Sequence, residues 1–319
     1  SPAGNDLPYD DSLCEQGRNF GNKIWNAFRL IQGLRVGPSG AEVQPDSAAA
    51  ATAWMRSRIS SATAEINGLF DQFRISEALM ATYKLVWDDY CSWYLESIKP
   101  AFVNGVAEPI DATTHAATIS LFEDLMKLLH PFMPFLSEEL WSHVRERKGP
   151  NEALIIAAWP QVATPDAALE AEVQHAFDLV SAVRNCRNER GLSPKEALAV
   201  QVKGTHPMRA AVSQLVHKLA NVSSIDAVAA QADGAITFLV GTTSYAVDLG
   251  GNIDTDAERK KAEDELNYQR GFLASVEKKL SNERFVAGAP AQVLENERKK
   301  KADAEAKIKE LEERLVVLK

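Results

Sequence analysis

The sequence has few of the features that hold small secreted domains or zinc proteins together. Its three cysteines, Cys14, Cys91 and Cys186, are odd in number and far apart, which argues against a disulfide framework and favours a reducing cytosol. No C-x-x-C or H-x-x-x-H pair occurs, so a structural zinc site is not expected. No apolar run reaches the roughly 18 residues that would span a bilayer, and no signal peptide opens the chain.

Catalytic motifs are missing as well. There is no Walker loop and no G-x-G-x-x-G, and the six histidines are scattered, none beside a Ser or Cys in a nucleophile motif. The paired carboxylates Asp88-Asp89 and Glu138-Glu139 are typical of solvated faces and helix starts. The sequence therefore predicts no catalytic residue and no metal ligand.

Length and charge suggest a protein of more than one part. The chain has 319 residues, a length typical of about two domains, and it opens with Ser-Pro rather than Met, as a piece of a larger protein would. The net charge is −9, but residues 255–319 hold 15 Lys/Arg against 14 Asp/Glu, so this stretch carries +1 and the rest carries −10. An acidic body binds nucleic acid poorly through its general field, so any such contact must be local.

The first half reads as consecutive amphipathic helices joined by moderate loops, the pattern of a helical bundle. Asp46 and Ser137 are predicted N-caps, and the third helix is rich in aromatic residues. The predicted helices cover residues 10–34, 46–72, 75–98, 113–130 and 136–147.

The pattern changes after Trp159-Pro160 to that of a small α/β unit. Two further helices and four strands are predicted, the last two strands forming a hairpin. The helices cover residues 166–189 and 207–219, and the strands 198–202, 222–228, 236–240 and 244–249.

The last 65 residues predict two long helices folded back on each other. Apolar residues recur at alternating steps of four and three, the seam of a coiled coil, and Gly288, Ala289 and Pro290 break the helix between the two arms. Because the break is short, antiparallel pairing within one chain is expected. Lys301 falls on the seam, so the hairpin should be loose there. The seam positions are Ala262, Leu266, Gln269, Leu273, Val276 and Leu280 on the first helix and Ala304, Ile308, Leu311, Leu315 and Leu318 on the second.

Two groups of residues are candidates for contact with nucleic acid. On the first helix, GRNFGNKIWNAFRL (Gly17–Leu30), a polar stripe combines amides that hydrogen-bond base edges with a lysine that neutralises phosphate. From chemistry alone, a solvated polar face with helix–helix contacts is the favoured explanation of this stripe. The second group is basic and lies on the hairpin, where it could contact a phosphate backbone or serve solubility and i,i+4 pairing.

Several segments together resemble the C-terminal half of bacterial valyl-tRNA synthetases. GRNFGNKIWNAFRL resembles the first helix of their anticodon-binding bundle, and KLLHPFMPFLSEELW its late helix pair. VRNCRNERGLSPKEAL is similar to the start of the linking α/β unit, and KKLSNERFVAGAPAQVLENERKK to the coiled-coil arm. The opening SPAGND resembles the segment shortly after the K-M-S-K-S loop of these enzymes.

The resemblance implies a mainly α fold: a helical anticodon-binding domain (1–160), a small α/β connector (161–253) and a coiled-coil tRNA-binding arm (254–319). It implies a cytoplasmic, monomeric ligase fragment that recognises the anticodon and outer corner of the valine tRNA. The H-x-G-H and K-M-S-K-S motifs and the editing domain are absent from this sequence, so the fragment should be inactive alone. No cofactor is expected in this chain; ATP and Mg belong to the full-length enzyme, whose catalytic and editing domains would be its other partners.

The resemblance also assigns roles to the two groups of residues. Leu30 stands where members of the family often have Phe. Because leucine has no aromatic ring, stacking on a base would be weaker in this chain. The predicted anticodon contacts are Asn19, Lys23, Asn26, Arg29 and Leu30, and the predicted outer-corner contacts are Lys278, Lys279, Arg284, Arg298, Lys299 and Lys300.

Two alternatives remain open at this point. The chain could be a structural interaction protein whose coiled coil pairs with a partner helix, in which case it should dimerise through the seam. It could also be a fragment of isoleucyl or leucyl type, although those families lack the arm.

Overall fold

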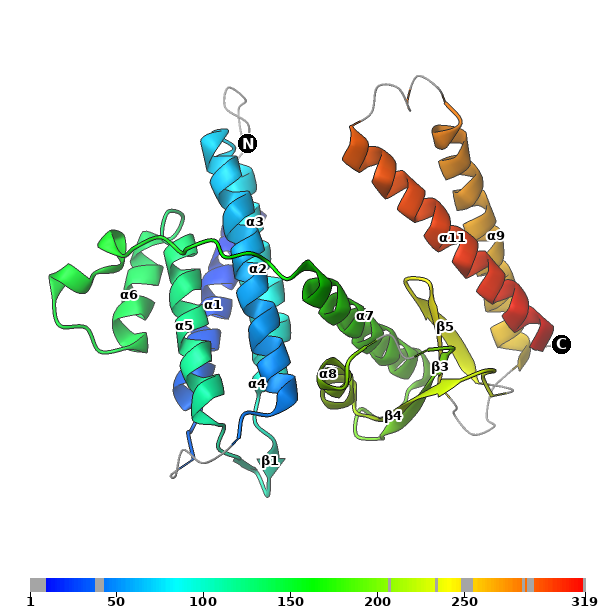
Figure 1. Cartoon of the computed structure of the whole chain (residues 1–319), viewed down its shortest axis with the longest axis horizontal. Helices are drawn as coiled ribbons and strands as arrows, with labels where there is room; N and C mark the ends of the chain where they lie inside the picture. Colours follow the sequence, from blue (N-terminus) through cyan, green and yellow to red (C-terminus); the bar gives the residue numbers. More distant parts are fainter. Residues whose placement is uncertain are drawn as a thin grey trace. The chain divides into compact units, whose positions relative to one another are not determined.

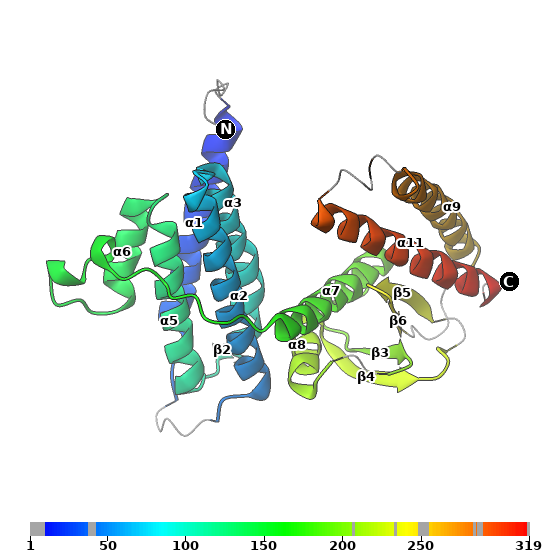
Figure 2. The same ribbon diagram turned by 45° about the horizontal axis from the view of Figure 1, so that its top comes forward.

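The computed structural model describes residues 10–37, 43–205, 208–232, 235–247, 255–282, 285 and 290–317. The chain divides into two compact units. The first takes in residues up to Gln174 together with 209–215, and the second takes in 175–208 and the residues from Val216 onward. Figures 1 and 2 show the arrangement of elements inside each unit.

The first unit is a helical bundle, as predicted. The third predicted helix is one continuous run whose middle, η1, has the wider π-helical hydrogen bonding. The helices are α1 (Asp11–Gly33), α2 (Asp46–Asp71), α3 (Ile75–Lys84), η1 (Leu85–Tyr94), α4 (Leu95–Ile98), α5 (Ala112–Leu129) and α6 (Pro134–Val144). A small hairpin and two 3₁₀ turns, which the sequence did not predict, are β1 (Phe102–Val103), β2 (Val106–Ala107), η2 (Pro150–Glu152) and η3 (Leu154–Ile156).

Aromatic side chains of the third helical run fill the centre of this bundle. Tyr90 and Tyr94 are fully buried, with their rings 5.4 Å apart. The hydroxyl of Tyr90 donates to the carbonyl of Thr118 at 3.2 Å, and the Tyr94 hydroxyl lies 2.9 Å from Thr118 Oγ1 on α5. These bonds matter because a buried hydroxyl without a partner is costly.

Two predicted helix caps are wrong by a few residues. α6 begins at Pro134, so Ser137 lies inside the helix, where its Oγ donates to the Met133 carbonyl at 2.9 Å and lies 2.8 Å from His130 Nδ1. Proline is favoured at the first position of a helix because it has no N–H that would need a partner. Pro134 therefore starts α6 three residues before the predicted cap at Ser137. α2 begins at Asp46 itself, and Pro45 stands at the N-cap.

The second unit contains the α/β part. Its sheet has the order β4-β3-β6-β5, with β3 parallel to β4 and antiparallel to β6, and β5 pairs with β6 as the predicted hairpin. The elements are α7 (Ala167–Arg190), which begins in the first unit, β3 (Leu198–Lys203), α8 (Ala210–Ala220), β4 (Val222–Val228), β5 (Ile236–Val240) and β6 (Thr243–Val247).

A buried arginine ties this part together. Arg187 is only 4% exposed, and its guanidinium donates to the carbonyls of Ser193, Ala220 and Asn221 at 2.9–3.0 Å. It thereby satisfies carbonyls at the C-terminal end of α8, which have no partner within the helix.

The second unit ends in the helical hairpin, formed by α9 (Thr255–Leu280) and α11 (Ala291–Val317). The two helices lie side by side in both views (Figures 1 and 2). Together with the bundle, the hairpin confirms the mainly α fold class. Among the described residues, every helix is too short or too polar to cross a membrane.

Candidate nucleic-acid interface

Helix α1 carries the residues predicted to contact the anticodon, and its sequence explains where the helix begins and which side of it is buried. Asp10 caps the first turn by accepting from the Ser12 N–H at 2.9 Å. The pKa of the Asp10 carboxyl is lowered, first by hydrogen bonding with the Ser12 side chain and then by this backbone bond. The buried stripe recurs at helical spacing and consists of Phe20, Ile24, Ala27, Phe28 and Ile31. The polar residues therefore lie on the two flanks of this stripe.

The predicted residues do not all share one flank. With about 100° between successive helical residues, Asn19, Lys23, Asn26 and Leu30 fall on one side of the buried stripe and Arg29 on the other. Asn19, Asn26 and Arg29 are exposed, whereas Lys23 and Leu30 are half-buried. The predicted set is thus four residues on one flank and a fifth residue on the opposite flank.

Lys23 already has a partner within the bundle. Its Nζ lies 5.1 Å from the centroid of the Trp87 ring, a cation–π contact. It also lies near Cys91, whose pKa burial raises to about 12 in spite of the lysine charge. The contact positions the ammonium at the surface of α1 and η1, and the side chain is only partly exposed.

The opposite flank of α1 carries the predicted Arg29 together with three residues that the sequence interpretation did not include, Arg18, Asn22 and Trp25. Arg18, Asn22, Trp25 and Arg29 follow one another at steps of four, three and four, and all are exposed. Trp25 is 40% exposed and packs one side against Phe28, with ring centroids 5.8 Å apart. Within the described part of the chain, neither Arg18 nor Arg29 pairs with an acidic side chain. An exposed ring between two unpaired arginines is a surface on which an unstacked base can stack. Their i, i+4, i+7, i+11 spacing was the signal for them.

The arm closes on itself along the predicted seam. Ala262, Leu266 and Leu311 form a buried cluster, against which Ile308 and Leu315 pack. Ion pairs flank the seam: Arg270 with Glu312 at 2.6 Å, and Lys301 with Glu277 at 2.9 Å. Lys301 therefore spans the two helices at the predicted loose point. Leu318 lies outside the described residues.

The basic residues of the arm divide into paired and unpaired groups. Lys279 and Lys300 lie 3.7 Å and 2.7 Å from the buried carboxylate of Glu297, and the hydrogen bond from Lys300 lowers the pKa of that carboxyl. Lys278, Arg298 and Lys299 are exposed, and among the described residues they have no acidic partner. Arg284 lies outside the described residues. The arm thus carries three unpaired cations in addition to two lysines that share one carboxylate.

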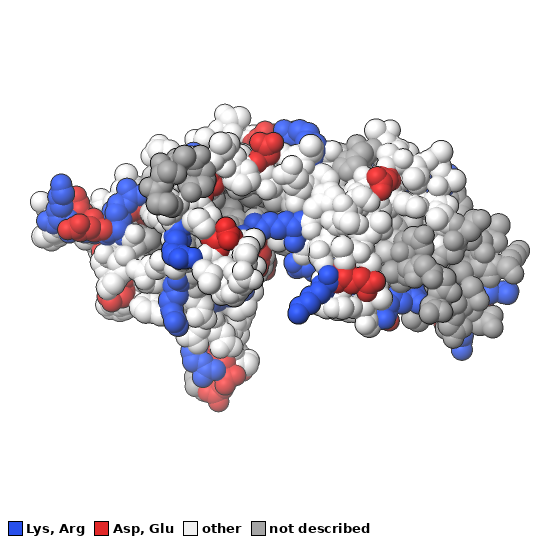
Figure 3. Space-filling view, turned by 90° about the horizontal axis from the view of Figure 1, so that it is seen from below, with Lys and Arg blue, Asp and Glu red and all other residues white. Residues whose placement is uncertain are grey.

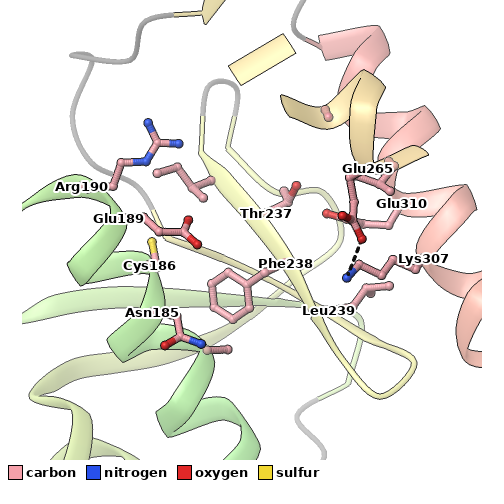
Figure 4. A pocket seen from close by; sticks show the side chains of 14 residues that line it. Asn185, Cys186, Glu189, Arg190, Thr237, Phe238, Leu239, Glu265, Lys307 and Glu310 are labelled. Carbon is pink, nitrogen blue, oxygen red and sulfur yellow. Dashed lines mark ion pairs between the residues drawn. The ribbon is translucent and has the colours of Figure 1, made fainter. Parts of the chain in front are cut away.

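The base of the arm packs against the α/β part around a cavity of about 420 Å³. Figure 4 shows Asn185 and Glu189 of α7, Phe238 of β5, and the ion pair between Glu265 and Lys307 at 3.3 Å. The side chain of Glu265 accepts from Gln269, and this hydrogen bond lowers the pKa of its carboxyl. The cavity lies where the arm joins the α/β part. Glu265 and Lys307 pair there, whereas the buried Oε1 of Glu310 has no hydrogen-bond partner among the described residues.

The surface charge of the described parts is mixed. On the face seen in Figure 3, basic and acidic side chains are interspersed. This agrees with the net charge of −9 and means that anion binding must rely on placed residues such as those on α1 and the arm.

Comparison with known proteins matches two regions of the chain, and α1 lies outside both of them. The family described as anticodon-binding domain of tRNA ligase matches residues 52–202, and the family described as valyl tRNA synthetase tRNA binding arm matches residues 254–319. The described part of the arm match consists of α9 and α11, the hairpin whose seam is given above.

Relatives extend the similarity over the whole chain. It is 48% identical over 318 residues to valine–tRNA ligase of Parabacteroides distasonis and 49% identical over 322 residues to that of Phocaeicola vulgatus, covering 100% of this chain and 35% of each relative. Valine–tRNA ligase of Mesorhizobium japonicum is 33% identical over 305 residues, covering 94% of this chain and 33% of the relative.

The chain thus spans about a third of the length of the curated relatives it matches, and the matched part is their C-terminal region. The helical bundle, the hairpin arm and the matches to both place it in one family. This chain belongs to the valyl-tRNA synthetase family, of which it comprises the anticodon-binding domain and the tRNA-binding arm.

Proposed function

We propose that this chain is the part of a valine–tRNA ligase that grips the valine tRNA while a catalytic domain outside this sequence attaches valine. The α1 face contacts the anticodon, and the arm contacts the outer corner of the tRNA. The full-length enzyme is cytoplasmic and uses ATP and Mg. This chain by itself acts as a monomer and catalyses no valine-dependent ATP–pyrophosphate exchange.

The arm is the observation that carries this proposal. It is a hairpin of two long helices whose seam closes within one chain, so it has little apolar surface left for a partner helix. What it exposes instead is a set of cations, Lys278, Arg298 and Lys299, in addition to the Glu297 pairs. Such a surface suits a phosphate backbone better than another coiled coil.

A salt titration of tRNA binding tests the proposal. Each lost phosphate contact flattens the slope of log affinity against log salt by about 0.7 to 0.9. Replacing Lys278, Arg298 and Lys299 together by Ala should therefore flatten the slope for valine tRNA by roughly two to three units. The matched control is Lys260→Ala with Lys309→Ala, two exposed lysines near the base of the arm, and it should change the slope little.

Equal slopes for the triple variant and the parent would mean that the arm is a brace and not an RNA contact. The alternative function, a structural interaction protein that pairs through its arm, predicts a dimer. Sedimentation at increasing concentration separates the two, because a pairing arm would dimerise and a closed hairpin would not.

A further inference from the structure

One end of the helical bundle carries apolar side chains that nothing in the described chain covers. We call this group the end patch. It consists of Leu13 (50% exposed), Phe73 (88%), Ile75 (50%), Leu79 (37%) and Met80 (56%). Leu13 is on the first turn of α1, and the other four lie at the α2–α3 turn and on α3.

Leu13 and Leu79 continue the apolar faces of α1 and α3, whereas Met80 lies on the opposite side of α3 from the buried Ala78 and Thr82. Ring contacts show that α1 and the α3–η1 run progress in the same direction, because Phe20 meets Tyr83 at 4.6 Å and Lys23 meets Trp87 at 5.1 Å. Leu13 lies two turns before Phe20 on the same face of α1, and Leu79 lies one turn before Tyr83. The first turns of α1 and α3 lie at the same end of the bundle in both ribbon views (Figures 1 and 2). Leu13 and Leu79 are interior positions by sequence pattern, yet they are exposed.

The backbone conformation of Phe73 is a second, independent indication that the end patch binds a partner. It ends α2 in a Schellman motif, with its N–H donating to the Phe70 carbonyl at 2.9 Å and the Arg74 N–H donating to the Leu69 carbonyl at 2.8 Å. The motif places Phe73 at φ 59°, a left-handed conformation that glycine adopts freely and a bulky residue does not. A phenylalanine that is strained and 88% exposed contributes nothing evident to the stability of the bundle.

A shallow hollow beside the patch, about 780 Å³ in volume, lies between α2 and α3 and is lined in part by Leu69, Met80 and Tyr83. Its rim is a poor site for RNA, because Arg74 is held by Glu77, with the Arg74 Nε donating to Oε1 at 2.6 Å. The patch is therefore apolar and lies beside a rim of mixed charge, in which Glu65, Lys84 and Asp88 accompany the Arg74–Glu77 pair. An apolar surface with a rim of both signs suits a protein partner better than an anionic backbone.

We propose that the end patch is the docking surface for the part of the full-length synthetase that precedes this chain. The relatives share only 35% of their length with it, and the matched region is their C-terminal part, so a large protein body joins the chain at the α1 end. The proposal rests on family membership and not on any contact with tRNA.

Footprinting of a full-length enzyme tests this. In a full-length protein that joins this chain to the preceding part of the Parabacteroides distasonis valine–tRNA ligase, hydroxyl-radical modification of Leu13, Phe73 and Met80 should fall several-fold relative to the isolated chain. Phe102, which is 70% exposed on the β1–β2 hairpin, is the internal control and should react equally in both. Aminoacylation by the joined protein reports that it is folded, and the natural Parabacteroides enzyme compared with its own matching fragment repeats the measurement without a junction.

The Phe73→Gly variant sharpens the test. It removes the left-handed strain, so the midpoint of thermal unfolding of the isolated chain should not fall. In the full-length protein, the unfolding midpoint should fall, and Leu13 and Met80 should become less protected from hydroxyl-radical modification. Phe102→Gly is the matched control and should not alter the protection of the end patch. Equal modification in both proteins overturns the proposal. So does protection that appears only with added tRNA, or that grows with the concentration of the isolated chain, because the occupant would then be RNA or a second copy.

Discussion

The bundle and the arm are both helical, but they are held together in different ways. In the bundle, large side chains such as Trp54, Tyr90 and Phe122 are almost completely buried by helices on several sides. In the arm, only one seam is available. Its most deeply buried described residues are Ala262, Val276, Ala304 and Leu311, none of them aromatic. Hydrophobic stabilisation scales with the apolar area removed from water, so the bundle gains much more of it per helix.

The arm has ion pairs between its two helices in addition to the apolar seam. Ion pairs cross between α9 and α11 at Arg270–Glu312, Lys279–Glu297 and Lys301–Glu277. Exposed pairs of this kind each contribute little, about 0–1 kcal/mol. The bundle is thus a rigid support for the face of α1, whereas the arm is a marginal structure whose cations serve both its own pairing and the proposed grip on tRNA.

A core substitution in the bundle should have the largest effect. Phe122→Ala removes a ring that lies 6.3 Å from Phe28 and 6.0 Å from Tyr90, and should lower the free energy of unfolding by about 3–5 kcal/mol. Denaturant unfolding followed by tryptophan fluorescence measures this loss, since the tryptophans lie in the first unit. A loss below about 1 kcal/mol would show that the bundle core is not the packed structure described here.

A seam substitution in the arm should cost less and act locally. Leu266→Ala should destabilise the arm by about 2 kcal/mol, at the low end for a buried leucine, because only one helix covers it. Hydrogen exchange should accelerate across α9 and α11 and remain unchanged in α1–α6. Tyr268→Ala, at a 66% exposed position on the same helix, is the control. Faster exchange in the bundle as well would contradict the separation of the two regions.

On α1, the two flanks can be compared directly. Lys23→Ala should weaken binding of valine tRNA by roughly 1–2 kcal/mol, the value of a charge-assisted hydrogen bond. Arg29→Ala is the matched substitution on the flank that carries Trp25. Footprints of the anticodon loop measure both. A footprint that changes only with Arg29→Ala would move the reading face to Arg18, Asn22, Trp25 and Arg29.

The smallest expected effect is a loss of arm helicity when the pH is lowered. Hydrogen bonds from Gln269 and Lys300 lower the pKa values of Glu265 and Glu297 in the folded state. These carboxylates therefore stabilise the arm fully at pH values above the pKa of an unfolded glutamate. This stability is lost as the pH falls through the pKa values of the folded state. Helicity of the arm should therefore decrease modestly between pH 7 and about pH 3. Glu297→Gln should remove part of this pH dependence. Helicity of the arm that does not respond to acid would show that the pairs contribute nothing.

Most of the helices and strands were predictable from the sequence because each depends on local periodicity. The buried stripe of α1 and the seam of α9 and α11 appear as steps of three and four, and an amphipathic helix in water must bury that stripe. The buried seam positions Leu266 and Leu311 follow from the pattern alone.

What only the tertiary structure decided concerns neighbours distant in sequence. Periodicity says which residues share a helix face, but not what lies opposite that face. The cation–π contact between Lys23 and Trp87, the sharing of Glu297 by Lys279 and Lys300, and the exposure of Leu13 each depend on a second element. Leu13 has the spacing of a core residue and is exposed because nothing in the described chain packs over it, and a sequence pattern cannot report the absence of a neighbour.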